Sequence, residues 1–406
     1  MLDNAGLSLP SVMMLYNLNP DWADSEREVV IRLSDDVALG LRKLGHPVHP
    51  IPLEDTDLTG TLRRWDPAEH VLFNWCEEIP GIQHSEPLAV HTIDDLDFVY
   101  TGSTHDVLML CEDKPRIKEA LSRRKVPVPR WGVYTTDAIE DWDCFPAIVK
   151  AAYEHSSVGM SPRSVVTTLA ELRSQVQFIL TKLSQPAVVE DFIDGREFHV
   201  SLWGDGNGGF HLLPPVEMDF SRLSDFHQRL CSYDAKFSVD SFAWRAIETR
   251  IPAVLSTEEQ QQLAAVCIAA SDVAGCRDYA RIDVRQRNGI FYVLDVNPNP
   301  DLSADASMAC AAETVGYAYP AMLSRLICLA ARRHPRWRED PNLLDMATVE
   351  NVVMNWFMPM TLKPEPVAPQ AQPDARPARR KRLRKSPAKP RRRRCMEGER
   401  PLDPAE

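Results

Sequence analysis

The sequence predicts an α/β fold in which an open sheet at the N-terminal end is followed by a part built from strands and hairpins. Residues 11–17, 46–52 and 71–75 read as short strands, and an amphipathic helix separates the first two. Residues 279–303 read as two strands joined by Asn288-Gly289, a dipeptide that favours a tight hairpin turn. With 406 residues and 44% hydrophobic content, the chain can fill the cores of two or three domains.

The helix after the first strand has recognisable start and stop signals. Ser25 can cap it, and Glu26 and Glu28 place negative charge at the positive end of its dipole. Apolar residues recur at helical spacing up to Gly45, where the helix should end. A strand, a helix and a strand at this spacing suggest an open α/β sheet, in which ligands gather at the carboxyl ends of the strands.

The middle of the chain combines two helices with a small-residue loop. One helix is expected from about residue 106, and a second follows residues 113–115 and runs through residue 121. The prolines within 126–129 end this helical region. Residues 145–150 form a strand that ends in Lys150, and residues 155–159 connect it to a further strand near 164–167. Such a loop can lay backbone N–H groups over phosphate oxygens, while a lysine supplies a point charge.

A second hairpin-like stretch covers residues 188–198, where a strand, a turn at Gly195 and another strand would form the hinge between two lobes. Its acidic residues could contact a nucleotide in that hinge or simply be solvated strand ends, and the residues alone leave both readings open. The glycine-rich stretch 204–209 predicts a hairpin turn, because it lacks the lysine of a Walker motif and leads into a strand. Residues 256–275 predict a core helix, and residues 309–331 predict a helical segment interrupted at 317–320.

The hairpin around Asn288-Gly289 carries the densest set of polar residues. Arg281, Asp283 and Arg285 share one face of the first strand, and Asp295 and Asn297 share one face of the second, because side chains two apart point the same way. Carboxylate and amide oxygens at that spacing suit Mg²⁺. An ordinary exposed hairpin whose polar face meets solvent is the alternative.

Charge is unevenly distributed along the chain. Residues 364–406 contain 13 Lys and Arg against 6 Asp and Glu, which gives this segment a net charge of +7. Because the whole chain has a net charge of −12, residues 1–363 have a net charge of −19. The acidic body argues against nucleic-acid binding by the folded part. The basic tail, rich in Pro, Ala and Arg, should be disordered. It is either a solvated extension or an electrostatic tether to nucleic acid, to an acidic partner or to the protein's own acidic body.

The remaining composition limits the class of protein. Nine scattered cysteines without a Cys-x-x-Cys pair argue against a disulfide framework and a zinc site. The apolar runs are too short for a membrane span, and the N-terminus lacks the pattern of a secretory signal. A cytoplasmic location is therefore expected.

Taken in order, these motifs resemble those of the D-alanine–D-alanine ligase-like family of the ATP-grasp superfamily. The passages that carry the resemblance are Asp113-Lys114, Phe145–Lys150 with Ser156-Ser157-Val158-Gly159, Glu190–Glu197, the 232–237 loop, and the Arg281-Ile-Asp283 and Asp295-Val-Asn297 pair of strands. The resemblance covers about residues 11–335. It implies an N-terminal pre-ATP-grasp α/β domain (residues 1–104), a central lobe (105–187) and a C-terminal lobe with the metal site (188–340) of a two-lobed α+β ATP-grasp fold, and a disordered basic tail (360–406).

The resemblance implies an ATP-dependent carboxylate–amine ligase that acts through an acyl phosphate with ATP and Mg²⁺. Two ions are expected, and Mn²⁺ is left open as a substitute. The implied nucleotide contacts are Lys114, Lys150 and Ser157 at the phosphates, Glu190 with the backbone of Asp191 and Ile193 at adenine, and Glu197 at the ribose. Asp283, Asp295 and Asn297 would hold the metal, and Arg281 would stabilise the acyl phosphate. The other implied catalytic residues are Ser156 in the small-residue loop, Lys236 in the mobile loop that closes the site, and Glu26 at the first substrate. For Glu26, which would hold an ammonium group, service to the helix dipole is the equal alternative.

Several residues depart from the family pattern where substrates would bind. His155 and Asp301 stand where the family has glycine, Phe237 replaces a tyrosine, and residues 74–78 replace a His-Gly stretch. These departures predict an amino-acid or small-peptide ligase with a substrate pair other than two D-alanines. The alternatives are an ATP-grasp kinase or carboxylase and, from another class, an inactive ATP-binding scaffold that recruits a partner through its basic tail. The sequence leaves open whether the protein is a homodimer.

Overall fold

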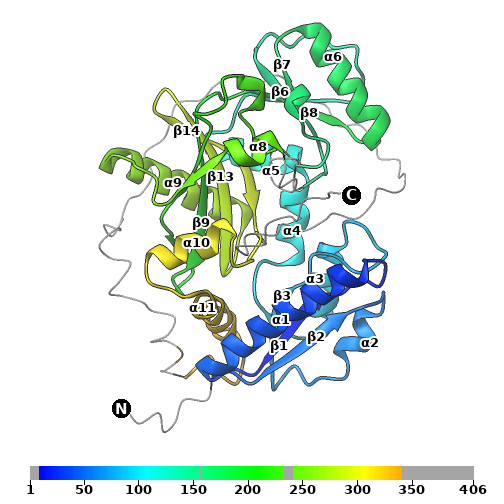
Figure 1. Cartoon of the computed structure of the whole chain (residues 1–406), viewed down its shortest axis with the longest axis vertical. Coiled ribbons are helices and arrows are strands. Elements are labelled where there is room, and N and C mark those ends of the chain that lie inside the picture. The colour runs from blue at the N-terminus through cyan, green and yellow to red at the C-terminus, as the bar shows by residue number, and fades with distance from the viewer. Residues whose placement is uncertain (1–8, 156, 233–240, 341–342, 344–406) are drawn as a thin grey trace, which may run out of the picture.

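The computed structural model describes residues 9–155, 157–232, 241–340 and 343. The described part contains three sheets that follow one another along the longest axis of the molecule, with the N-terminal elements at one end and the β6–β8 lobe at the other (Figure 1). Ser156, Lys236, Phe237 and the basic tail lie outside the described residues, so their predicted roles stay predictions.

The N-terminal sheet is parallel and has the strand order β2-β1-β3-β4, as expected for an open α/β arrangement. Its core strand β1 is buried along its whole length because helices cover both faces. The elements are β1 (Val12–Asn17), α1 (Asp24–Leu44), β2 (Val48–Leu53), α2 (Leu58–Leu62), β3 (Val71–Trp75), α3 (Glu86–Asp95) and β4 (Val99–Tyr100).

Helix α1 ends as predicted but begins differently. Gly45 adopts φ 107°, and its N–H closes the last turn onto Arg42. The helix starts at Asp24 with Ala23 at the cap position, so the prediction that Ser25 caps it is wrong. Glu26 accepts the Ala23 backbone N–H at 3.2 Å, which satisfies one of the donors that every helix start leaves unpaired.

The outer lobe holds an antiparallel sheet of order β5-β8-β6-β7 with α6 packed beside it (Figure 1). Leu172 and Val176 of α6 pack against Val149 and Val189 of the sheet. The elements are β5 (Trp131–Tyr134), β6 (Ala147–Ala151), the 3₁₀ turn η1 (Pro162–Ser164), β7 (Val165–Val166), α6 (Leu169–Phe178), the π-helical turn η2 (Ile179–Leu183) and β8 (Ala187–Asp191).

The central sheet has the order β12-β11-β9-β13-β14, and β10 also pairs with β9. Helix α9 covers one face through Leu263 and Cys267, which contact the same core as Ile282 and Val293. The elements are β9 (Arg196–Gly204), β10 (Phe210–Leu212), β11 (Val216–Asp219), the 3₁₀ turn η3 (Phe226–Gln228), α8 (Phe242–Ala246), β12 (Glu248–Arg250), α9 (Thr257–Ala274), β13 (Tyr279–Arg287) and β14 (Ile290–Asn297).

The chain passes from the outer sheet to the central sheet between β8 and β9, as the predicted hinge at Gly195 requires. A Cβ atom at Gly195 would lie 1.9 Å from the carbonyl oxygen of Gln286, so only glycine fits beside β13. The expected hairpin turn at residues 204–209 joins β9 to β10.

Four more helices among the described residues lie between or beside the three sheets. Helix α11 packs against α1 and contributes to a core that also includes strand β1 and Trp203 of the central sheet. The elements are α4 (His105–Glu112), α5 (Lys114–Arg123), α10 (Ser307–Thr314) and α11 (Tyr319–Ala331). Among the described residues, none of the helices combines the length and apolar character needed to span a lipid bilayer. The proposed boundaries at residues 104/105 and 187/188 stay predictions.

Candidate active site

The β13–β14 hairpin brings its polar residues to one face by means of an extra residue. Asn288 and Gly289 adopt φ 55° and 77°, as the predicted tight turn requires. A regular ladder from that turn would place Leu294 opposite Asp283 and turn Asp295 to the other face. The register shifts by one residue between Val284 and Asp283, so that Asp295 lies opposite Asp283 instead. The β-bulge at Leu294 is therefore what makes the two carboxylates converge.

Asp283 is the centre of the first polar group. The guanidinium of Arg281 donates to both of its oxygens, from Nε at 2.7 Å and from Nη2 at 3.0 Å. Asn297 Nδ2 donates to the same carboxylate at 3.1 Å. Burial opposes the charge on Arg281, but Asp283 outweighs it and raises the pKa of the guanidinium. The structure thus brings together three residues that the sequence assigned to catalysis and metal binding.

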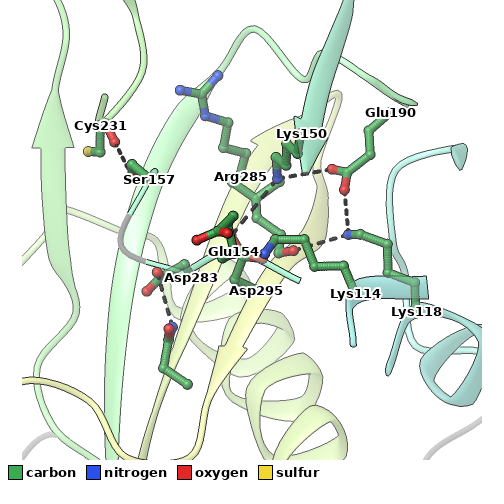
Figure 2. A network of polar contacts seen from close by, with 12 residues as sticks. Lys114, Lys118, Lys150, Glu154, Ser157, Glu190, Cys231, Asp283, Arg285 and Asp295 are labelled. Atoms are coloured by element: carbon green, nitrogen blue, oxygen red, sulfur yellow. Dashed lines mark hydrogen bonds and ion pairs between the residues drawn. The ribbon is translucent and has the colours of Figure 1, made fainter. Parts of the chain in front are cut away.

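A second polar group joins the two sheets through Glu190. This carboxylate is fully buried on β8 and lies 3.2 Å from Lys150 Nζ and 3.1 Å from Lys118 Nζ. Lys150 also lies 3.9 Å from Asp295, and Figure 2 shows the three lysines Lys114, Lys118 and Lys150 converging on this region. Burial lowers the pKa of Lys150, but Asp295 and Glu190 outweigh that effect and the net shift is upward. Lys150 is therefore held in its charged form.

Lys114 lies beside this group at the first position of α5. Its ammonium donates to the backbone carbonyl of Glu154, on the loop that precedes Ser156 (Figure 2). Burial lowers the pKa of Lys114, although the negative charge of Asp295 opposes the shift. Lys114 thus lies near Lys150 and Asp295, and its contact with phosphate stays a prediction.

The predicted nucleotide residues lie around the passage from β8 to β9. Glu197 is buried, and its Oε2 accepts from Arg285 Nε at 2.7 Å. Arg285 also donates to the carbonyl of Ile193 at 2.9 Å. Burial opposes ionisation of Glu197, but Arg285 and then His199 outweigh it and lower the pKa. Asp191 forms an ion pair with Arg287, and its backbone N–H donates to the carbonyl of Arg130 at 2.8 Å.

Ser157 and Glu26, two further predicted site residues, contact backbone groups of the protein. Ser157, with φ 63°, donates its hydroxyl to the carbonyl of Cys231 at 2.7 Å, which links the small-residue loop to the segment before residue 233 (Figure 2). Glu26 is exposed, and its described contact is the cap of α1. The structure thus supports the helix-start role for Glu26, and its contact with a substrate stays a prediction.

Lys118 and Arg285 are functional candidates to which the sequence analysis assigned no role. Lys118 is 1% exposed and donates to the Leu294 carbonyl at 3.0 Å, so it ties Glu190 to the bulge. Its position one helical turn after Lys114 was its only sequence signal. The sequence pattern already placed Arg285 on the face of Arg281 and Asp283, but it did not show the pairing of Arg285 with Glu197.

The donor set at the bulge fits a hard divalent cation. Asp283 and Asp295 supply carboxylate oxygens, and because the amide nitrogen of Asn297 makes the contacts with Asp283 and the Arg281 carbonyl, its oxygen is the atom available to a cation. Mg²⁺ prefers such ligands together with phosphate oxygens. The lysines beside the carboxylates match the other half of that requirement, since they can neutralise a polyphosphate.

Comparisons with known proteins agree with this geometry. Residues 130–328 match the family model described as the D-ala D-ala ligase C-terminus. The chain is 31% identical over 315 residues to the uncharacterized protein y4sG of Sinorhizobium fredii, covering 75% of this chain and 88% of that protein. It is 26% identical over 309 residues to the D-alanine–D-alanine ligase of Pseudothermotoga lettingae, covering 76% and 96%.

A solved structure matches as well. The D-alanine–D-alanine ligase of Bacillus anthracis complexed with ATP has a TM-score of 0.60 and 21% sequence identity, covering 80% of this chain and 98% of that one. This match shows the shared fold. Together with the family model and the relatives, it establishes that the chain belongs to the D-alanine–D-alanine ligase-like family of ATP-grasp ligases.

Proposed function

We propose that the protein joins the carboxylate of one small substrate to the amine of another, through an acyl phosphate formed with Mg-ATP. The observation that carries the proposal is the bulged hairpin, which sets Asp283 opposite Asp295. The carboxylate of Asp295 lies 3.9 Å from the ammonium group of Lys150, which is charged. Phosphoryl transfer depends on positioning and on neutralising phosphate charge, and this arrangement supplies both.

The proposed reaction has two steps. The substrate carboxylate attacks the γ-phosphorus of ATP and ADP leaves. The neutral amine of the second substrate then attacks the acyl carbon, phosphate leaves, and the nitrogen gives up one proton, which the departing phosphate can take. Lys114 and Lys150 neutralise phosphate charge, and Arg281 stabilises the acyl phosphate and the oxyanion that follows it. Because such catalysis is electrostatic, it needs no nucleophilic side chain.

Asp283, Asp295 and Asn297 would hold Mg²⁺, and we propose two ions with Mn²⁺ as a substitute. When bound, the metal neutralises charge on the β and γ phosphates. For the nucleotide we propose that Glu190, with the backbone of Asp191 and Ile193, contacts adenine and that Glu197 contacts the ribose. Their support is their placement along the passage between the two sheets.

For the substrates we propose an amino-acid or peptide pair other than two D-alanines. Asp301 replaces a family glycine, and its negative charge acts on Arg281. Its Oδ1 accepts the Ser303 backbone N–H at 2.8 Å, so the carboxylate is held in a defined turn beside the site. An added carboxylate next to the oxyanion-stabilising arginine would change which amine is accepted.

The proposal is tested by phosphate release from ATP and Mg²⁺ with amino acids of both configurations, singly and in pairs. We expect release that requires one particular pair, a condensed product by mass spectrometry, and loss of both with Asp295→Ala. Binding of ATP without cleavage across the whole panel would favour the scaffold alternative. Efficient synthesis of D-alanyl-D-alanine would contradict the proposed substrate choice. A cytoplasmic location and a partner for the basic tail stay predictions.

A further inference from the structure

Three different ligand types meet at one point on the active-site face of β9. Glu197 and His199 lie two residues apart on that strand and are both buried, and Cys231 approaches them from the segment before residue 233. One donor atom from each residue, a carboxylate oxygen, an imidazole nitrogen and the thiol sulfur, lies within 4.8 Å of the other two. The carboxylate Oε1 and His199 Nε2 are 3.4 Å apart.

This spacing suits a small tetrahedral cation. Zn²⁺ binds nitrogen and oxygen at about 2.0–2.2 Å and sulfur at about 2.3 Å, which puts neighbouring ligand atoms roughly 3.4–3.6 Å apart. The oxygen and nitrogen already have that separation, and the sulfur, which lies within 4.8 Å of both, needs to approach them by at most about 1.2–1.4 Å. Mixed nitrogen, oxygen and thiolate ligands favour Zn²⁺ over Mg²⁺.

The second atom of two ligands is already held, as in protein zinc sites. His199 Nδ1 lies 3.3 Å from Ser307 Oγ, at the start of α10. Glu197 Oε2 accepts from Arg285 at 2.7 Å. Such contacts fix the orientation of a ligand and leave the other atom directed at the metal.

The cysteine spacing argued against a zinc site, but a site with a single cysteine ligand needs no Cys-x-x-Cys pair. We infer that Glu197, His199 and Cys231 form a Zn²⁺ site, separate from the Mg²⁺ ligands and with its fourth position open to water. A bound Zn²⁺ would occupy Glu197 Oε1 and keep this residue from the ribose, so Zn²⁺ and nucleotide would compete. This second part rests on the proposed nucleotide role of Glu197, whereas the metal site itself does not. The site would make the ligase sensitive to zinc.

The test uses the full chain, stripped of metal and free of nucleotide, titrated with Co²⁺ as a spectroscopic substitute for zinc. We expect one thiolate-bound Co²⁺ per chain, counted by its charge-transfer band in the near ultraviolet and displaced by Zn²⁺ but not by Mg²⁺. Cys231→Ser should abolish the band and His199→Gln should weaken binding at least about tenfold, whereas Cys276→Ser should leave both unchanged. Thermal unfolding checks that each variant folds.

Either of two results would overturn the site: no thiolate band in the wild-type chain, or a band that persists in Cys231→Ser. If a variant fails to fold, the rate of Cys231 alkylation in the wild-type chain tests the site instead. Bound Zn²⁺ should slow this alkylation, and equal rates with and without Zn²⁺ would refute the site. The nucleotide part is tested by adding ATP, which should weaken Zn²⁺ binding. A Zn²⁺ affinity unchanged by bound ATP would overturn the ribose contact of Glu197 and leave the metal site standing.

Discussion

Arg281 holds Asp283 through two parallel hydrogen bonds of 2.7 and 3.0 Å, so the residue assigned to the acyl phosphate grips a residue assigned to the metal. A carboxylate that binds a cation shares its negative charge between the cation and the guanidinium. Cation binding at Asp283 should therefore weaken the neutralisation of Arg281 by this carboxylate, so that more of the positive charge of Arg281 acts on the substrate. The two proposed functions of the hairpin would then be coupled through this one carboxylate.

Replacing Arg281 should separate those two functions. In Arg281→Met we expect the ATP-dependent ligation rate to fall about 10²–10³-fold, because one preorganised donor to the oxyanion is lost. The Mg²⁺ concentration for half-maximal activity should fall, because a competing positive charge leaves Asp283. Steady-state kinetics over a Mg²⁺ series measure both effects. Arg281→Lys, which keeps the charge but loses the paired geometry, is the matched control, and a higher Mg²⁺ requirement in the methionine variant would disprove the coupling.

The buried Lys118–Glu190 ion pair should matter more for stability than its single contact suggests. Lys118→Met leaves Glu190 fully buried with Lys150 as its remaining described cation, and we expect the free energy of unfolding to fall by about 3–5 kcal/mol. Urea denaturation of Lys118→Met, Glu190→Gln and the double variant measures the coupling. The double variant should lose clearly less than the sum of the two single variants. Additive losses would show that the pair is not a coupled unit.

Glu112 should make stability depend on pH. Burial raises the pKa of this carboxyl from 4.5 to about 7, so between those values the folded chain binds more protons than the unfolded chain. Stability from this group is fully present below about pH 4.5 and is lost as the pH rises through about 7. Glu112→Gln should therefore be more stable than the wild type by about 1–3 kcal/mol at pH 8 and equal to it near pH 4.

Denaturation curves at the two pH values check this expectation for Glu112. Glu119→Gln on neighbouring α5 is the control, because Glu119 and its partner Arg123 are both largely exposed. Its effect should stay within about 0.5 kcal/mol at either pH. A Glu112→Gln variant that is less stable than the wild type at pH 8 would reverse the assigned sign.

Gly195 should tolerate no side chain. In Gly195→Ala the new Cβ would meet the Gln286 carbonyl at 1.9 Å, so β9 must shift away from β13. We expect a loss of about 1–3 kcal/mol in unfolding free energy and a raised KM for ATP, because Ile193 and Glu197 lie on either side of this glycine. Gly132→Ala, whose Cβ would meet Tyr134 at an ordinary 3.4 Å, should change neither by much. Equal behaviour of the two variants would contradict the role of Gly195.

The fold followed from local signals wherever those signals were strong. Helix α9 has its capping pair Ser256 and Glu259 and ends at Gly275 with φ 76°, as its sequence predicts. The turn of the β13–β14 hairpin was equally predictable. The start of α1 was not, because Ala23 occupies the cap position and the carboxylate of Glu26 supplies the capping contact from within the helix.

The site depended on a feature that the sequence pattern does not announce. Period-two alternation places Asp295 and Asn297 on a common face, but the two-residue turn alone would direct that face away from Asp283. The bulge at Leu294 corrects this, and its carbonyl is held by Lys118, which lies 176 positions earlier in the chain. Such a long-range contact cannot be read from local propensity, and the pairing of Arg285 with Glu197 is missed for the same reason.

The central claim is that this hairpin serves carboxylate activation by phosphoryl transfer, and isotope transfer tests it most directly. For the substrate pair that supports phosphate release, the carboxylate would be labelled with ¹⁸O and the products analysed by mass spectrometry. We predict ADP and inorganic phosphate that carries one ¹⁸O from the carboxylate, because that oxygen bridges carbon and phosphorus in the acyl phosphate. Formation of AMP and pyrophosphate, or phosphate without label, would contradict the account.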